Sequence, residues 1–168
     1  MMSQTTETSL LAAQIVKQAA ARGSPIVTAE SCTGGMVAAA LTEIPGSSAA
    51  FERGLVTYSN AAKRELLGVL ASTLDQHGAV SSQTAAQMVA GALAHTPSAS
   101  LAVAITGVAG PSGGSAEKPV GLVHFACQHR DSNARLAEKI FPGDRSAIRV
   151  QATLFALKML AEMLESGD

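Results

Sequence analysis

The segment Leu101–Ile105 reads LAVAI, an unbroken apolar run. A strand with one face in water alternates apolar and polar residues, whereas a strand covered on both faces shows a continuous apolar run. We therefore expect residues 101–105 to form a strand that is buried on both faces. Such a strand belongs in a sheet that has helices on both sides.

Helix-type and strand-type patterns alternate along the rest of the chain. Ser9 is expected as the N-cap of a first helix that ends at Gly23. The other expected helices cover residues 36–43, the segment that follows Asn60 as N-cap, the segment from Ser81 or Ser82 to His95, and the segment from Asp144 onward. The other expected strands cover residues 25–28, 54–59, 122–127 and 134–141. The last two strands would pair as a hairpin. The sequence thus predicts an α/β fold whose mostly parallel sheet contains one antiparallel strand.

The length of 168 residues indicates one domain, which we place at residues 8–165, after a disordered tail at residues 1–7. Hydrophobic residues make up 47% of the chain, but aromatic residues only 3%, and tryptophan is absent. The core must therefore be built from aliphatic side chains, alanine and methionine. The apolar content is also compatible with a homo-oligomer.

Composition and charge exclude several classes of protein. Twelve basic against 13 acidic residues give a net charge of −1, and the chain has no basic tract that would bind nucleic acid. Neither a secretory signal nor a CxxC pair is present, so we expect a cytoplasmic protein. No apolar stretch approaches the roughly 18 residues of a membrane span. No cluster of ligands predicts a metal.

Three segments rich in small and reactive residues follow three of the expected strands. They read TAESCTGG, TYSN and TGVAGPSGG. Ligands bind beyond the carboxyl ends of the strands in open α/β sheets, so these segments can meet at one edge. The sequence therefore places its candidate site there.

The first segment offers two adjacent nucleophiles, Ser31 and Cys32. Ser31 would lie at the positive end of a helix, where backbone N–H groups could stabilise an oxyanion. Cys32 could attack as a thiolate, but a small buried cysteine is more common. A structural alternative is a simple strand-to-helix turn in which Thr33 caps the helix and Gly34 and Gly35 allow close packing.

Lys63 is the best candidate for a base, because none of the four histidines is placed convincingly. With Asn60 as N-cap, Lys63 would occupy the third helical position, where a cation is unfavourable. Desolvation and the positive helix end would lower its pKa. The alternative is a solvated surface lysine beside Arg64.

The glycine-rich segment from Gly107 to Gly114 matches neither phosphate-loop motif, because it lacks both GK[ST] and GxGxxG. It could form an anion-binding nest or a plain flexible loop. Arg145 follows Asp144, the expected N-cap of the last helix, and Arg149 lies one turn later. An anion such as a phosphate would relieve the unfavourable charge there, with Arg149 adding longer-range attraction. Two solvated arginines are the alternative.

Four separated motifs carry a resemblance to a known family: TAESCTGG, FERGLVTYSNAAK, ITGVAGPSGGSAEKPVG and GDRSAIR. In this order and spacing they closely resemble the CinA C-terminal domain family, whose stand-alone members are nicotinamide-nucleotide amidases. The resemblance covers the chain from the first helix to the last. It implies a three-layer α/β/α domain with a mixed five-stranded sheet and hydrolysis of nicotinamide mononucleotide without a cofactor.

The resemblance also implies roles for individual residues. Ser31 would be the nucleophile and Lys63 the base. Tyr58, Asn60, Thr106 and Arg145 match positions in or beside the site motifs of the family. Apart from the resemblance, the backbone N–H groups near Cys32, Thr33, Gly34 and Gly35 are our candidates for the oxyanion site, and the glycine-rich segment that begins at Gly107 would hold the ribose phosphate together with Arg145. Two rival hypotheses remain: a non-catalytic nucleotide-binding module of the same fold, and a thiol hydrolase that uses Cys32.

Overall fold

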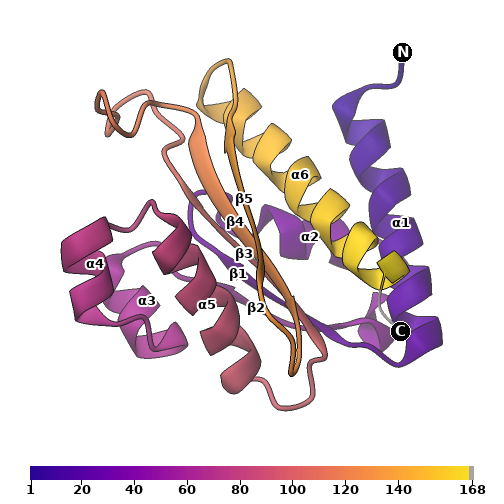
Figure 1. Ribbon diagram of the computed structural model, residues 1–168. Coiled ribbons are helices and arrows are strands. Elements are labelled where there is room, and N and C mark those ends of the chain that lie inside the picture. Colours follow the sequence, from indigo (N-terminus) through magenta and orange to yellow (C-terminus); the bar gives the residue numbers. More distant parts are fainter. Residues whose placement is uncertain (167–168) are drawn as a thin grey trace.

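A computed structural model describes residues 1–166 and places a mixed sheet at the centre of the molecule (Figure 1). Within these residues the sheet has five strands in the order β2-β1-β3-β4-β5. Their bounds are β1 Ile26–Glu30, β2 Phe51–Val56, β3 Leu101–Gly107, β4 Leu122–His129 and β5 Arg135–Ile140. β1 pairs in parallel with β2 and β3, whereas β4 runs antiparallel to β3 and β5. The expected single antiparallel strand is therefore β4.

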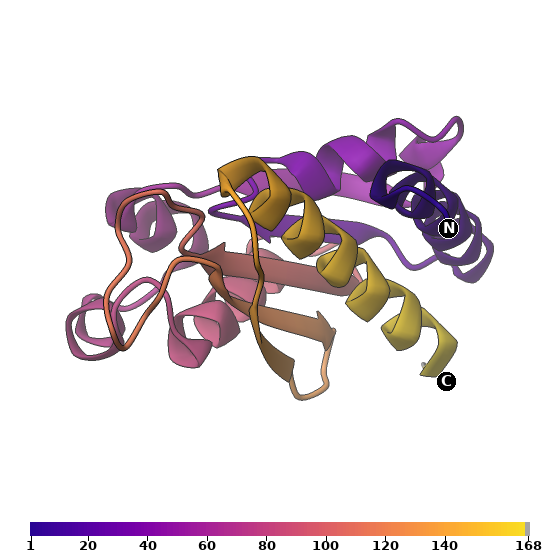
Figure 2. The same ribbon diagram turned by 90° about the horizontal axis from the view of Figure 1, so that it is seen from above.

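Helices cover both faces of the sheet, which confirms the three-layer α/β/α architecture (Figures 1 and 2). One layer contains α1 Gln4–Arg22, α2 Met36–Thr42 and α6 Arg145–Ser166, and the other contains α3 Asn60–Leu67, α4 Ala71–His77 and α5 Ser82–Ala94. Each layer encloses its own apolar core. Residues 101–105 of β3 contribute alternately to the two cores and are all fully buried. This explains why the run contains no polar position.

The backbones of α5 and α3 approach very closely at one glycine. A Cβ atom on Gly91 would lie 1.8 Å from the carbonyl oxygen of Leu67, the last residue of α3. Real carbon and oxygen atoms cannot come so close, so only glycine fits at this crossing. Gly91 therefore fixes how α3 lies against α5.

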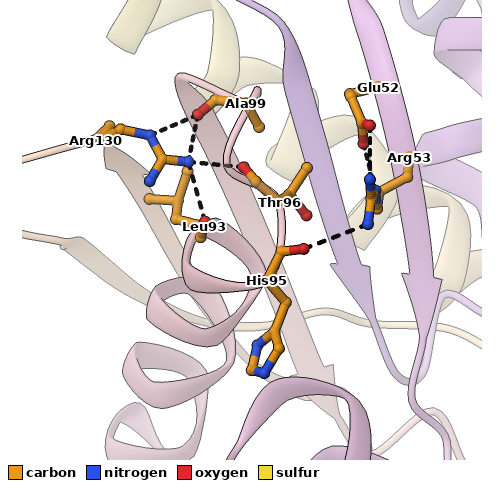
Figure 3. Close-up of polar contacts among 7 residues, drawn as sticks. All are labelled: Glu52, Arg53, Leu93, His95, Thr96, Ala99 and Arg130. Carbon is orange, nitrogen blue, oxygen red and sulfur yellow. Dashed lines mark hydrogen bonds and ion pairs between the residues drawn. The ribbon is translucent and has the colours of Figure 1, made fainter.

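Two arginines bind the C-terminal end of α5 (Figure 3). Arg130, directly after β4, donates hydrogen bonds to the carbonyl oxygens of Leu93, Thr96 and Ala99 at 2.6–3.0 Å. Arg53 of β2 donates to the carbonyl of His95 and forms an ion pair with Glu52. The last carbonyls of a helix lack partners within the helix, and these side chains supply them.

Several expected details were wrong. α1 begins earlier than expected, because its N-cap is Ser3 and not Ser9. Residues 4–7, which were expected to belong to a disordered tail, therefore form the first turn of α1. Ser59 and not Asn60 caps α3, since its hydroxyl oxygen accepts from the Ala62 N–H. α4 was not among the expected helices. By contrast, Asp144 caps α6 as expected, with its carboxylate accepting from the Ala147 N–H.

Candidate active site

The segments after β1, β2 and β3 meet at one edge of the sheet and enclose a cavity of about 270 Å³. The turn after β1 contributes Ser31 and Cys32 to its wall. Tyr58 and Lys63 come from the segment after β2 and from α3. Thr106 and Gly107 end β3, and Arg145 begins α6. The structure thus brings together seven of the predicted site residues, although they lie far apart in the sequence.

The side chains of Lys63 and Ser31 are in direct contact. Lys63 Nζ lies 3.0 Å from Ser31 Oγ, 2.8 Å from the Thr57 carbonyl oxygen and 3.4 Å from the Tyr58 carbonyl oxygen. Lys63 is only 1% exposed and Ser31 only 8%. Both groups are therefore held in fixed positions and largely out of water.

Burial lowers the pKa of Lys63 below its ordinary value of 10.5. Within residues 1–166 no carboxylate forms an ion pair with it that would restore the charged form. An ammonium group has three N–H donors and no acceptor, whereas a neutral amine has two donors and one lone pair. The Thr57 and Tyr58 carbonyls can take both donors of the neutral amine, which leaves the lone pair to accept the Ser31 hydroxyl proton. This arrangement suits a nucleophile and its base.

The helical position that singled out Lys63 was wrong, although the residue is in the site. Because Ser59 is the N-cap, Lys63 is the fourth helical residue and not the third. Its own N–H donates to the Ser59 carbonyl, so its backbone belongs to the regular helix. Desolvation, rather than an unfavourable helix position, is the main cause of its lowered pKa.

The side chain of Glu30, which was not among the predicted site residues, lies at the start of α2. Its buried carboxylate accepts from the Thr33 hydroxyl at 2.7 Å and from the backbone N–H groups of Val37 and Ala38 at 2.8 and 3.1 Å. Gly35 is the N-cap and has no side chain to do this. The carboxylate therefore binds free N–H groups in the first turn of α2, which lie outside the Cys32–Gly35 segment expected to hold the oxyanion.

Among residues 32–35, only Cys32 lines the cavity. The Thr33 side chain is fully buried and binds Glu30 instead of capping α2. The Gly34 N–H donates to the Ser31 carbonyl, and both glycines have positive φ, at 59° and 103°. The two glycines thus shape the turn, which other residues could not adopt without strain. Because Cys32 is the residue of this turn that lines the cavity, its N–H is the candidate oxyanion donor.

The Cys32 thiol is a poor nucleophile in this position. Burial raises its pKa to about 11, and the side chain is only 4% exposed. A thiolate is the reactive form of cysteine, so a raised pKa opposes attack at neutral pH. The serine is the better nucleophile of the adjacent pair.

Comparison with known proteins identifies the family of this chain. A family profile described as the CinA C-terminal domain matches residues 8–164. The chain belongs to the CinA C-terminal domain family. Two relatives are named nicotinamide-nucleotide amidohydrolase PncC. The protein from Enterobacter agglomerans is 55% identical over 82% of this chain and 84% of its own length. The protein from Escherichia coli strain K12 is 51% identical over 89% of this chain and 90% of its own length.

Solved structures of the CinA family share the whole fold. The crystal structure of the competence/damage inducible protein CihA from Agrobacterium tumefaciens matches with a TM-score of 0.92 and 50% identity, over 95% of this chain and 96% of that one. The competence damage-inducible protein A from Klebsiella pneumoniae matches with a TM-score of 0.91 and 39% identity, over 96% and 99%.

Arg145 joins three segments in the wall of the cavity that contains Ser31 and Lys63. Its guanidinium donates to the Tyr58 hydroxyl at 2.7 Å and to the Gly110 carbonyl at 2.9 Å. A second cavity of about 610 Å³ lies beside the first and shares Ala109 and Arg145 with it. Its wall also includes Gly143, which precedes α6, and Ser146, which lies in the first turn of α6. Arg145 therefore stands between the two cavities.

Three predicted residues make contacts other than those expected. Asn60 is exposed and does not line the cavity. Arg149 was expected to act on an anion at longer range, but its guanidinium donates to the carbonyls of Cys32 and Thr33. The Thr106 hydroxyl donates to the Ala79 carbonyl at 2.7 Å, so it holds the segment before α5 against the site.

The remaining features concern metals and membranes. Residues 1–166 contain no group of three or more His, Cys, Asp or Glu side chains that could hold a metal ion. Over the same residues no helix combines the length and the apolar character that a transmembrane span needs.

Proposed function

We propose that this chain is a nicotinamide-nucleotide amidohydrolase that converts nicotinamide mononucleotide to nicotinate mononucleotide and ammonia. The observation that carries the proposal is the contact of 3.0 Å between Lys63 Nζ and Ser31 Oγ in the wall of a cavity. The names of the PncC relatives, at 51–55% identity over most of the chain, supply the substrate. The reaction would be carried by one domain over residues 8–165.

In the first half of the reaction, Ser31 forms an ester with the substrate. Neutral Lys63 accepts the hydroxyl proton while Ser31 Oγ bonds to the carboxamide carbon, and the carbonyl electron pair moves to oxygen. The Cys32 N–H would donate to this oxyanion. When the adduct collapses, the C–N bond breaks and the Lys63 ammonium returns its proton to the leaving nitrogen. Ammonia departs, and the amine is neutral again.

Water completes the reaction by the reverse sequence of proton transfers. Lys63 accepts a proton from the attacking water as its oxygen bonds to the ester carbon. The bond to Ser31 Oγ then breaks, and Lys63 returns the proton to the serine. The acyl group leaves as a carboxylic acid, which gives its proton to water or ammonia, so the product is the nucleotide with a carboxylate in place of the carboxamide. Every proton is held by Lys63, Ser31, water or ammonia, so the chemistry requires no cofactor.

The two adjoining cavities suggest how the nucleotide is placed. The pyridine ring would enter the smaller cavity, where its carboxamide meets Ser31. The ribose phosphate would extend into the larger cavity at the start of α6, where a helix N-terminus and a guanidinium favour an anion. Arg145, between the cavities, would bind the phosphate and would exchange its contact with Tyr58 for this one.

This reaction would place the protein in the salvage of pyridine nucleotides in the cytoplasm. The decisive test is release of ammonia from nicotinamide mononucleotide by the purified protein with a metal chelator present. Stoichiometric ammonia and nicotinate mononucleotide would support the proposal. Saturable binding of the nucleotide without ammonia would instead support the non-catalytic nucleotide-binding module.

A further inference from the structure

We infer that Arg149 is a positioning residue that holds the Ser31 turn in the shape that presents the Cys32 N–H to the oxyanion. The inference rests on the proposed amidohydrolase function. Arg149 lies in α6, more than a hundred residues from the turn in the sequence. Its contacts reach the two residues that follow the nucleophile.

The guanidinium makes two hydrogen bonds to main-chain oxygens. Arg149 Nε donates to the Cys32 carbonyl at 3.0 Å, and Nη2 donates to the Thr33 carbonyl at 3.2 Å. Within residues 1–166 no carboxylate forms an ion pair with Arg149. This half-buried cation is therefore used to hold backbone, not to balance a charged side chain.

Peptide geometry carries this contact to the nucleophile. In a planar trans peptide the C=O and N–H bonds point in opposite directions. By fixing the Thr33 carbonyl, Arg149 fixes the direction of the Gly34 N–H in the same peptide. That N–H donates to the Ser31 carbonyl at 3.0 Å. The Ser31 carbonyl in turn shares its peptide with the Cys32 N–H, so its orientation sets where this N–H points.

The turn is shaped to receive the guanidinium. A Cβ atom on Gly34 would lie 3.2 Å from Arg149 Nη2, which is tighter than ordinary contact. Glycine at this position therefore both permits the positive φ of 59° and leaves room for the arginine. The Ser31 N–H is bonded separately to the Ile105 carbonyl at 2.9 Å, which holds the other side of the turn to β3.

A competing role is possible for the same residue, because Arg149 also lines the larger cavity where a phosphate would bind. The two roles make opposite predictions about substrates. A positioning role affects the chemical step, so it affects every amide substrate equally. A phosphate-binding role affects only substrates that carry the phosphate.

The test compares Arg149→Met and Arg149→Lys with the wild-type protein on nicotinamide mononucleotide and on nicotinamide riboside, which lacks the phosphate. For Arg149→Met we expect kcat to fall about a hundredfold to a thousandfold, the effect of losing one oxyanion donor, on both substrates alike. KM should change little. Arg149→Lys should lose less, since an ammonium can donate to these carbonyls but cannot match the fork of the guanidinium. Lys158→Met, which removes a half-exposed cation from the same helix, is the control and should retain activity.

Two further readouts separate positioning from general damage. Thermal unfolding should show that Arg149→Met is folded at the assay temperature. The pH at which kcat/KM rises should not move, because Arg149 does not touch Lys63. Loss confined to nicotinamide mononucleotide, a rise in KM alone, or unchanged kcat in Arg149→Met would each overturn the inference. A wild-type protein that releases no ammonia would refute the proposed function itself.

Discussion

Replacing Lys63 by methionine should change the pH dependence of stability in a way that reports the charge of the buried amine. Methionine keeps an unbranched side chain of similar length and removes the titrating group. The pKa of Lys63 is lowered in the folded state by burial, whereas in the unfolded chain it returns to about its ordinary 10.5. Between these two pKa values the unfolded chain holds one more proton on this residue than the folded protein.

The magnitude follows from linkage. A difference of one proton makes the free energy of unfolding rise by about 1.4 kcal/mol per pH unit. The stability of the wild type relative to Lys63→Met is therefore lowest below the folded-state pKa. It rises with pH through the window and levels off above 10.5. The methionine also loses the hydrogen bonds to the Thr57 and Tyr58 carbonyls, which shifts the offset between the curves but not the slope in the window.

The assay is denaturant-induced unfolding of both proteins from about pH 6 to about pH 10, with the difference plotted against pH. Other groups titrate in both proteins, so their contributions largely cancel in the difference. In the wild type, kcat/KM should begin to rise with pH where the stability difference begins to rise, because the neutral amine is the base. The variant should lose at least about a hundredfold in kcat. If the difference in the free energy of unfolding does not change with pH over this range, the amine of Lys63 is not neutral in the folded protein.

Three other predictions test the site and the fold. Ser31→Ala should abolish ammonia release, whereas Cys32→Ala should retain a measurable kcat, because the thiol is buried and protonated; the reverse pattern would assign the chemistry to the cysteine. Arg145→Ala should reduce kcat/KM about tenfold to a hundredfold on nicotinamide mononucleotide, the effect of losing a hydrogen bond to a charged group, and much less on nicotinamide riboside. Equal losses on the two would mean that Arg145 does not bind the phosphate. Gly91→Ala should lower the melting temperature, because the added Cβ would collide with the Leu67 carbonyl. In a helix without such a contact, alanine is about 1 kcal/mol more stable than glycine, so a higher melting temperature would contradict the close approach to Leu67.

The fold could be predicted from sequence because its signals are local. The apolar run of β3 and the alternating helix and strand patterns predicted the layers and a single antiparallel strand, and the pairing in the structure identifies that strand as β4. Helix starts were harder to place where more than one residue could serve as N-cap, as with Ser59 and Asn60 or Ser3 and Ser9. α4 was missed because its sequence ASTLDQH has no apolar periodicity.

The candidate site shows the limit of such local signals. Lys63 was chosen for an assumed helix position, but its burial arises from packing between α3, the Thr57 segment and the Ser31 turn. The contact between Arg149 and the Cys32 carbonyl joins residues 117 positions apart. No pattern within either segment could indicate it. The family resemblance predicted site residues, and the structure was needed to give each its contacts.

The arginine after β4 also links the local opening of two elements. One guanidinium binds the Leu93, Thr96 and Ala99 carbonyls, so the end of β4 cannot separate from α5 without exposing all three together (Figure 3). The β4–β5 hairpin and the last turn of α5 should therefore open as one cooperative unit. Native-state hydrogen exchange would then give similar opening free energies for the amides of His95 and Arg130, which bond to the Gly91 and Ser100 carbonyls. Arg130→Met should let the helix end exchange faster while the hairpin stays protected.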